Sequence, residues 1–196
     1  MKLLVLGSDG FVGSNLTKEL KKLADHELSL VKGKHQLDVQ DTSALSEYLK
    51  EKSPDIIFNC VAHVGSLHYV SEFPADVIKD NIELNLSLYK SVVNSKITPI
   101  IVNCLSNCSY PGSSNIHIED QWWNGEVHGS VFSYGNSKKI QFMISKCYHE
   151  QYGVSSINLL IPNAFGPGDH LDSNRAHAIN GMILRMIKEM RSEKIG

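Results

Sequence analysis

Long hydrophobic runs are absent from this chain of 196 residues. A helix that spans a bilayer needs about 20 predominantly apolar residues, and no stretch approaches that length. The apolar segment at residues 1–6 leads directly into a glycine motif, which indicates a buried strand rather than a signal peptide. We therefore expect a cytoplasmic protein that does not interact with membranes.

A strong charge of either sign is also absent. The 19 lysines and arginines against 21 aspartates and glutamates give a net charge of -2, and no basic stripe is visible. Nucleic-acid binding consequently has no electrostatic support. With 42% hydrophobic and 20% charged residues, the composition is that of a globular protein, and the length suits one domain over residues 1–196.

Cysteine and histidine patterns typical of metal sites are missing. Cys104 and Cys108 form a C-x3-C spacing that matches no common zinc or thioredoxin motif. The histidines are scattered without the spacing of metal ligands. We expect no metal site, and we interpret all four cysteines as reduced thiols.

Short apolar runs alternate with longer amphipathic stretches along the whole chain. This alternation predicts an α/β fold with a doubly wound parallel sheet, the Rossmann fold, covered by helices on both faces. Strands are predicted at residues 3–6, 28–31, 56–60, 99–104 and 156–161, with a short extended piece at 36–39; helices are predicted at 11–24, 41–52, 74–95, 132–152 and 176–191. Residues 111–130 show no period, and long irregular loops in compact domains are often functional.

A glycine-rich turn, Gly7-Ser8-Asp9-Gly10-Phe11-Val12-Gly13, joins the first predicted strand to the first helix. The first glycine allows a tight turn, the second lets the backbone approach a pyrophosphate, and the third lets the helix pack closely on the sheet. The helix N-terminus presents free N–H groups to the phosphates. We expect a dinucleotide here; the alternative is a glycine-rich turn without a ligand. The predicted cofactor-binding residues of the turn are Gly7, Ser8, Gly10, Phe11, Val12 and Gly13.

The end of the second strand lacks the acidic residue that usually binds the ribose of NAD. Residues 30–34 read Leu-Val-Lys-Gly-Lys instead. Lys32 could pair with a 2′-phosphate, so the sequence favours NADP, with NAD still possible. The alternative is that Lys32 and Lys34 are solvated loop residues.

Tyr134 and Lys138 form a Tyr-x-x-x-Lys spacing at the start of a predicted helix, which places both side chains on one helix face. A phenol with its ordinary pKa near 10 is a poor acid–base catalyst near neutrality, and a neighbouring ammonium together with a cofactor ribose would lower that pKa. Ser106 ends the preceding strand and could hydrogen-bond a substrate oxygen. The glycine turn, Ser106 and Tyr-x-x-x-Lys together predict hydride transfer coupled to proton transfer at Tyr134.

These motifs resemble those of the extended short-chain dehydrogenase/reductases, the NAD-dependent epimerase/dehydratase family. Within it, the chain is most similar to the epimerase-reductases of GDP-linked 4-keto-6-deoxy sugars. The resemblance covers nearly the whole chain up to Arg185. It is carried by residues 7–13, Ala62-His63-Val64-Gly65, Phe73-Pro74-Ala75-Asp76, Ser106–Pro111, Tyr134–Lys138 and Pro162-Asn163-Ala164-Phe165-Gly166-Pro167.

The resemblance implies a role for each matching residue. Ser106, Tyr134 and Lys138 correspond to the family's catalytic triad, Cys108 to the base of C3/C5 epimerisation, and His177 to the matching acid. Ser106, Asn107, Asn163 and Arg185 are the implied substrate-binding residues. The implied cofactor-binding residues, beside the glycine turn, are Lys32, Asp38, Val39, Ala62, Val64, Tyr134, Lys138, Pro162, Asn163 and Ala164.

The resemblance also implies partners and a domain arrangement. Family members act on nucleotide sugars, here a GDP-sugar by preference, and commonly form homodimers, which would pack through residues 74–95 and 132–152. They continue into a substrate domain that is absent from this chain or only begun at residues 165–196. Leu105 and Asn107 replace small residues of the family pattern, and one extra residue precedes His177. Two other functions stay open: another nucleotide-sugar epimerase, dehydratase or reductase, and a cofactor-binding module without turnover.

Overall fold

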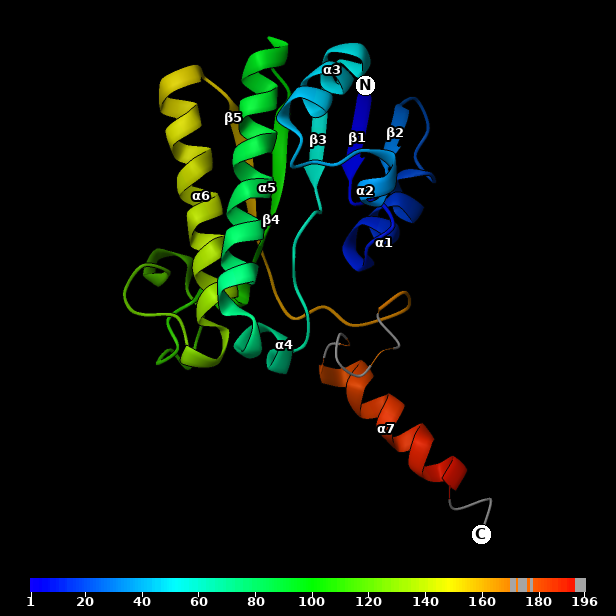
Figure 1. Ribbon diagram of the computed structural model, residues 1–196, viewed down its shortest axis with the longest axis vertical. Coiled ribbons are helices and arrows are strands. Elements are labelled where there is room, and N and C mark those ends of the chain that lie inside the picture. The colour runs from blue at the N-terminus through cyan, green and yellow to red at the C-terminus, as the bar shows by residue number, and fades with distance from the viewer. Residues whose placement is uncertain (170–171, 173–175, 177, 193–196) are drawn as a thin grey trace.

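A five-stranded parallel sheet in the order β2-β1-β3-β4-β5 forms the centre of the computed structural model (Figure 1). The structure describes residues 1–169, 172, 176 and 178–192. The strands are β1 (Lys2–Leu6), β2 (Glu27–Val31), β3 (Ile56–Asn59), β4 (Ile100–Ser106) and β5 (Ser155–Ile161). The helices are α1 (Phe11–Leu20), α2 (Gly33–Gln36), α3 (Thr42–Lys52), α4 (Leu67–Glu72), α5 (Pro74–Ser95), α6 (Phe132–Tyr152) and α7 (Ala178–Ser192). The α/β class and the parallel sheet predicted from the sequence are confirmed.

The two faces of the sheet are covered unequally. Helices α3, α5 and α6 pack over one face and bury the main apolar core, which includes Leu6, Ile57 and Leu88. Helix α1 packs on the other face, where Leu20 meets Leu3 and Val5. Ile157 and Leu159 of β5 also point to this second face and are 49% and 45% exposed. The described residues therefore leave this face partly exposed at β5.

Local signals in the sequence set most helix boundaries. The Asp41 carboxylate accepts hydrogen bonds from the N–H groups of Ser43 and Ala44 and so caps α3. Pro74 occupies the first turn of α5, where its missing N–H costs nothing. Gly153, with φ of 72°, ends α6 in the left-handed conformation that glycine adopts easily.

The extended piece predicted at residues 36–39 is wrong. Helix α2 ends at Gln36, residues 37–38 form no regular element and a turn follows at 39–40; the sheet has no strand beyond β2 among the described residues. The Gln36 side chain explains the difference, since it accepts a hydrogen bond from the Lys32 N–H at 2.8 Å and donates one to the Leu30 carbonyl at 3.2 Å. These bonds turn the chain back onto the end of β2 instead of extending it.

The predicted irregular loop at residues 111–130 is confirmed in outline. It holds the 3-10 turn η2 (Glu119–Gln121) and the start of a second one, η3 (Gly129–Val131), and the Pro111–Val127 bridge closes it. Trp122 is buried beneath the loop with Leu105 and Tyr110, so it packs the loop onto the end of β4. Trp122 therefore covers the hydrophobic floor of the loop.

Candidate active site at the carboxyl edge of the sheet

The glycine turn lies at the carboxyl end of β1, as predicted. Gly7 has φ of +74°, and its α-carbon faces the carbonyl of Cys60 so closely that a side chain would crowd it. A β-carbon on Gly13 would overlap the Gly7 carbonyl, so glycine alone permits this approach of α1 to the turn. Ser8 ties the turn to β2 through hydrogen bonds from its N–H and hydroxyl to the Val31 carbonyl, at 2.9 and 3.1 Å.

The N-terminus of α1 suits an anionic ligand. No side chain in the described part of the chain caps this helix at Gly10, and its first turn contains no acidic residue. The positive end of the helix dipole therefore lies at the glycine turn, where it favours an anion such as a phosphate. The turn has the strand before it and the helix after it that a pyrophosphate cradle requires.

The predicted NADP determinants lie beside this turn, together with a residue that sequence reasoning did not single out. Lys32 is exposed at the end of β2, whereas the Lys34 ammonium donates to Gln40 Oε1 at 2.8 Å. Asp9 reaches the same place, and its carboxylate accepts the Gly33 N–H at 3.2 Å. The clue was present in the sequence as an acidic residue inside the glycine motif itself.

The segment after β3, residues 60–66, carries the predicted cofactor residues Ala62 and Val64 and is anchored by a chain of polar contacts. His63 Nδ1 lies 2.6 Å from Asp80 Oδ2 on α5, and His63 Nε2 lies 2.9 Å from the Tyr69 hydroxyl on α4. Burial raises the pKa of Asp80, but the hydrogen bonds from His63 and Lys79 outweigh it and hold that pKa below its usual value. The spacing of His63, Tyr69 and Asp80 in the sequence does not predict these contacts, because only the fold brings the three residues together.

The end of β4 places Ser106 and Cys108 at the same edge. The Ser106 hydroxyl accepts the Cys108 N–H at 3.2 Å at the start of the 3-10 turn η1 (Asn107–Ser109). A β-carbon on Gly135 would overlap the Cys108 carbonyl, so Gly135 lets the first turn of α6 approach η1 closely. The Asn107 side-chain oxygen is buried and has no hydrogen-bond partner among the described residues.

Tyr134 and Lys138 lie on one face of α6, and Ser106 approaches them from the end of β4. The Tyr134 hydroxyl interacts with the Ser106 side chain by a hydrogen bond, and the Lys138 ammonium lies 5.5 Å from the centre of the Tyr134 ring. The structure therefore brings the three predicted triad residues together.

The electrostatics of this group differ from the expectation. Burial raises the pKa of Tyr134, and the nearby Cys108 and Cys104 thiols raise it further, whereas the Ser106 hydrogen bond works in the opposite direction. Lys138 is only 3% exposed, and burial lowers its pKa to about 8. Its ammonium donates to the Cys104 carbonyl and to Gln141 Oε1, both at 3.0 Å. The lowering of the Tyr134 pKa that the sequence suggested is thus not achieved by these protein groups alone.

Five further predicted residues occupy two places. Pro162, Asn163 and Ala164 follow β5 and are exposed at the carboxyl edge; the segment is tied to α1 by a hydrogen bond from Asn15 Nδ2 to the Pro167 carbonyl at 3.0 Å. The Val39 side chain is buried in the main core, and the Asp38 carboxylate accepts the Gln40 N–H at 3.0 Å.

Two predicted residues are not brought to the triad. Arg185 is exposed on α7, a helix that projects away from the sheet in Figure 1. The predicted acid, His177, lies outside the described residues.

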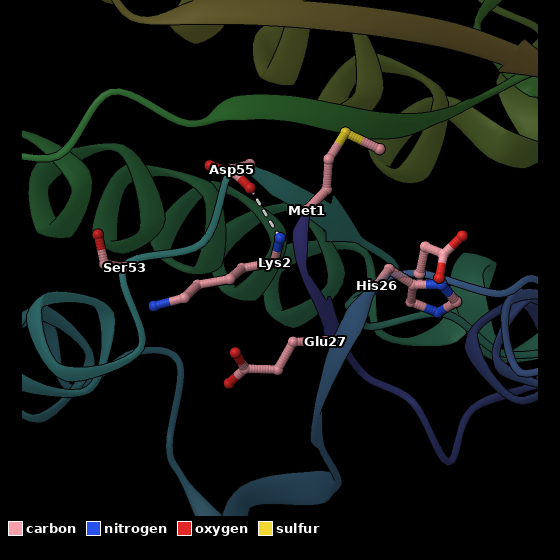
Figure 2. A pocket seen from close by; sticks show the side chains of 7 residues that line it. Met1, Lys2, His26, Glu27, Ser53 and Asp55 are labelled. Atoms are coloured by element: carbon pink, nitrogen blue, oxygen red, sulfur yellow. Dashed lines mark hydrogen bonds between the residues drawn. The ribbon is translucent and has the colours of Figure 1, made fainter.

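A hollow also exists at the opposite, amino edge of the sheet, lined by Met1, Lys2, Asp25, His26, Glu27, Ser53 and Asp55 (Figure 2). There the Lys2 N–H donates to Asp55 Oδ2 at 2.7 Å, and the side chains of Lys2 and Glu27 extend into the open space. Charges of both signs line it, and it contains none of the predicted site residues. The carboxyl edge, not this hollow, is therefore the candidate active site.

In the described part of the chain, no group of three or more metal-ligating side chains converges. None of the helices described is both long and apolar enough to cross a membrane.

Comparison with known proteins agrees with the geometry. Residues 3–195 match the NAD dependent epimerase/dehydratase family. A probable GDP-L-fucose synthase of Drosophila melanogaster is 27% identical over 187 residues, which is 94% of this chain and 58% of the relative. A GDP-L-colitose synthase of Yersinia pseudotuberculosis is 24% identical over 99% of this chain and 63% of its own length. This chain thus spans about three fifths of the curated relatives that it matches.

Solved structures confirm the fold. A GDP-L-fucose synthetase from Naegleria fowleri bound to NADP superposes with a TM-score of 0.84 at 21% identity, covering 98% of this chain and 59% of that one. A GDP-D-glycero-L-gluco-heptose synthase from Campylobacter jejuni, crystallised with NADPH, gives 0.80 at 22% identity over 95% and 53%. The sheet and its helices therefore have the Rossmann-like fold of these structures.

The burial of Lys138 predicts a pH-dependent stability. Burial lowers its pKa to about 8 from 10.5, so between these values the folded state has released a proton that the unfolded state still binds. Stability from this group therefore rises with pH across that interval. Relative to Lys138→Met, which cannot titrate, the wild type should gain about 3 kcal/mol from pH 8 to 10.5. Urea unfolding at several pH values measures this difference in the free energy of unfolding. Lys146→Met, on the exposed side of α6, is the control. Parallel pH profiles for the wild type and Lys138→Met would contradict the burial of this ammonium.

Proposed function

This chain belongs to the NAD dependent epimerase/dehydratase family, and from that premise we propose that it acts as an NADP-dependent epimerase-reductase of a nucleotide-linked 4-keto-6-deoxy sugar, a GDP-sugar by preference. The observation that carries the proposal is the meeting of Ser106, Tyr134 and Lys138 at the carboxyl edge of the sheet, where the glycine turn leads into the N-terminus of α1. We propose residues 1–196 as the cofactor-binding domain.

The chain's own residues fit a nicotinamide dinucleotide. The uncapped N-terminus of α1 would hold the pyrophosphate, and Gly7 and Gly13 keep side chains away from it. Residues 62–64 and 162–164, at the same edge, would line the nicotinamide half. When bound, the cofactor supplies or accepts a hydride.

Proton transfer is the task that we assign to Tyr134. The Ser106 hydroxyl would hold the substrate oxygen, and Tyr134 would give that oxygen a proton while the carbon receives hydride. Lys138 would stabilise the phenolate that Tyr134 leaves behind, because an ammonium near the ring favours the charged form. Burial raises the pKa of Tyr134 in the protein without cofactor, so the phenol stays protonated and can donate its proton.

Epimerisation beside a keto group needs a base on one ring face and an acid on the other. We propose Cys108 as the base and His177 as the acid, since a thiol and an imidazole can both exchange protons near neutral pH. Cys108 lies between Ser106 and the first turn of α6, which supports its contact with the same sugar.

A second candidate function is a module that binds the cofactor without turnover, because the predicted sugar contact Arg185 is not brought to the triad. For either function we propose a homodimer that packs through α5 and α6, where Met143 is 46% exposed on the outer surface. Calorimetry separates the two functions: NADPH binding without GDP-sugar binding would favour the module.

Replacing Tyr134 tests the proposed reaction. Tyr134→Phe removes only the proton donor, so NADPH oxidation against a panel of nucleotide-linked keto-sugars should fall about 10²- to 10⁴-fold. NADPH affinity should change little, because the ring remains. Tyr152→Phe, an exposed tyrosine at the other end of α6, is the control. Turnover that survives in Tyr134→Phe would contradict the role of the phenol.

Replacing Cys108 tests the epimerase half separately. Cys108→Ser should abolish the exchange of substrate ring protons into D2O, followed by NMR, because a hydroxyl is a far weaker base than a thiolate at neutral pH. NADPH binding should remain intact. Cys147→Ser, at an exposed position on α6, is the matched control. Exchange at the wild-type rate in Cys108→Ser would exclude this cysteine as the base.

The preference for NADP should depend on opposite charges at the end of β2. Lys32→Ala should weaken NADPH binding about threefold to fivefold, the size expected for an exposed ion pair, and leave NADH binding unchanged. Asp9→Asn should strengthen NADPH binding by a similar factor, since it removes a carboxylate near Gly33. Fluorescence titrations measure both, with Lys50→Ala on α3 as the control. Equal effects on NADPH and NADH would place the 2′-phosphate elsewhere.

A further inference from the structure

A row of amide side chains crosses the sheet beneath α5 and α6. Asn59 of β3, Asn103 of β4 and Asn158 of β5 are register partners on neighbouring strands. Asn59 is 1% exposed, Asn103 is fully buried and Asn158 is half-buried. Burying an amide without hydrogen-bond partners costs several kcal/mol, so polar side chains at these adjacent positions require an explanation. We call these three residues the amide ladder.

The amide ladder is a connected chain of hydrogen bonds. Asn59 Nδ2 donates to Asn103 Oδ1 at 3.0 Å, and Asn103 Nδ2 donates to Asn158 Oδ1 at 2.9 Å. Asn158 Nδ2 donates in turn to Ser145 Oγ on α6 at 3.1 Å. Asn103 is the centre, because it also donates to the Tyr89 hydroxyl of α5 at 2.8 Å.

Gln141 of α6 connects the ladder to the site. Its Nε2 donates to Asn103 Oδ1 at 3.1 Å, and its Oε1 accepts the Lys138 ammonium at 3.0 Å. Gln141 is only 1% exposed, so both ends of its amide are bound within the core.

Lys138 determines which way these amides point. An ammonium can only donate, so Gln141 must turn its oxygen to Lys138 and its nitrogen to Asn103. Asn103 must then present its oxygen to Gln141 and its nitrogen to Tyr89 and Asn158. One orientation of the whole ladder is therefore consistent with the ammonium, and that orientation holds the Gln141 oxygen in place.

We propose that Gln141 is a positioning residue, which holds the Lys138 ammonium at the carboxyl end of β4 and is itself fixed by the amide ladder through Asn103. Two of the three N–H donors of Lys138 go to Gln141 and to the Cys104 carbonyl. Within the described part of the chain, the third donor is left for a hydroxyl of a bound ligand. This use of the third donor rests on the proposed function, whereas the holding of the ammonium does not.

The groups that face Lys138 allow a test of Gln141 alone. Beside Gln141 and the Cys104 carbonyl, Lys138 faces the Tyr134 ring and the Cys60 and Cys104 thiols. Substitutions at Gln141 leave all of these in place. Methionine matches glutamine in volume but removes the acceptor, and glutamate keeps the shape but places a negative charge at the ammonium.

The experiment follows the Lys138 Cε resonance by NMR against pH in chain labelled with ¹³C-lysine, assigned by its loss in Lys138→Arg. The wild-type midpoint is expected near pH 8. Gln141→Met should lower it by about one pH unit, since a bond that favours the charged form is lost, and Gln141→Glu should raise it by about one unit. Gln151→Met, an exposed glutamine of α6, should leave it unchanged. NADPH affinity should fall about fivefold in Gln141→Met, the loss expected for one hydrogen bond.

Opposite shifts in the two Gln141 variants are the signature of a positioning oxygen. Unchanged midpoints, or shifts in the same direction, would mean that Gln141 only fills the core, and would overturn the proposal. If Gln141→Met does not fold, the Gln141→Glu arm decides, and a wild-type midpoint there overturns it. Failure of the proposed function is distinguishable, because a wild-type chain that binds no NADPH would still show the two opposite NMR shifts.

Discussion

The Lys138 ammonium is held inside the protein by two neutral oxygens, the Cys104 carbonyl and Gln141 Oε1. A charge with so little compensation is costly to bury, and its pKa is lowered accordingly. The first half of α6, the end of β4 and the polar residues under the sheet are arranged around this one group. Tyr134 lies on the same helix as Lys138, and Ser106 lies on the same strand as Cys104. The hydrogen bond from Lys138 to the Cys104 carbonyl therefore also brings Tyr134 close to Ser106.

Parallel pairing brings the separate parts of the site to one edge. The register of β1 with β3 and of β3 with β4 aligns Leu6, Asn59 and Asn103 across three strands. The glycine turn, the segment after β3 and the Ser106 turn therefore leave the sheet side by side. Close approaches that only glycine allows, at Gly7, Gly13 and Gly135, then bring helices onto these turns. The edge thus combines a phosphate-binding helix end with a proton-transfer group.

Local and periodic signals predicted most of this arrangement. Strand–helix alternation predicted the sheet, and Gly7–Gly13 and Tyr134–Lys138 predicted the two halves of the site. The strand at residues 36–39 was wrong because the Gln36 side chain folds back onto the chain, an interaction that no periodicity encodes. The contacts of His63 with Asp80, and of Gln141 with Asn103, join residues 17 and 38 positions apart. Such pairs are decided by tertiary packing, so the sequence alone gave no sign of them.

The proposed function requires a dinucleotide across the first strand–helix junction, with its nicotinamide facing Tyr134. A crystal structure of the chain grown with NADP tests this placement most directly. The pyrophosphate is expected against the first turn of α1 and the nicotinamide ring beside the Tyr134 hydroxyl. An empty crevice at saturating NADP, or a dinucleotide bound in the hollow at the amino edge, would contradict it.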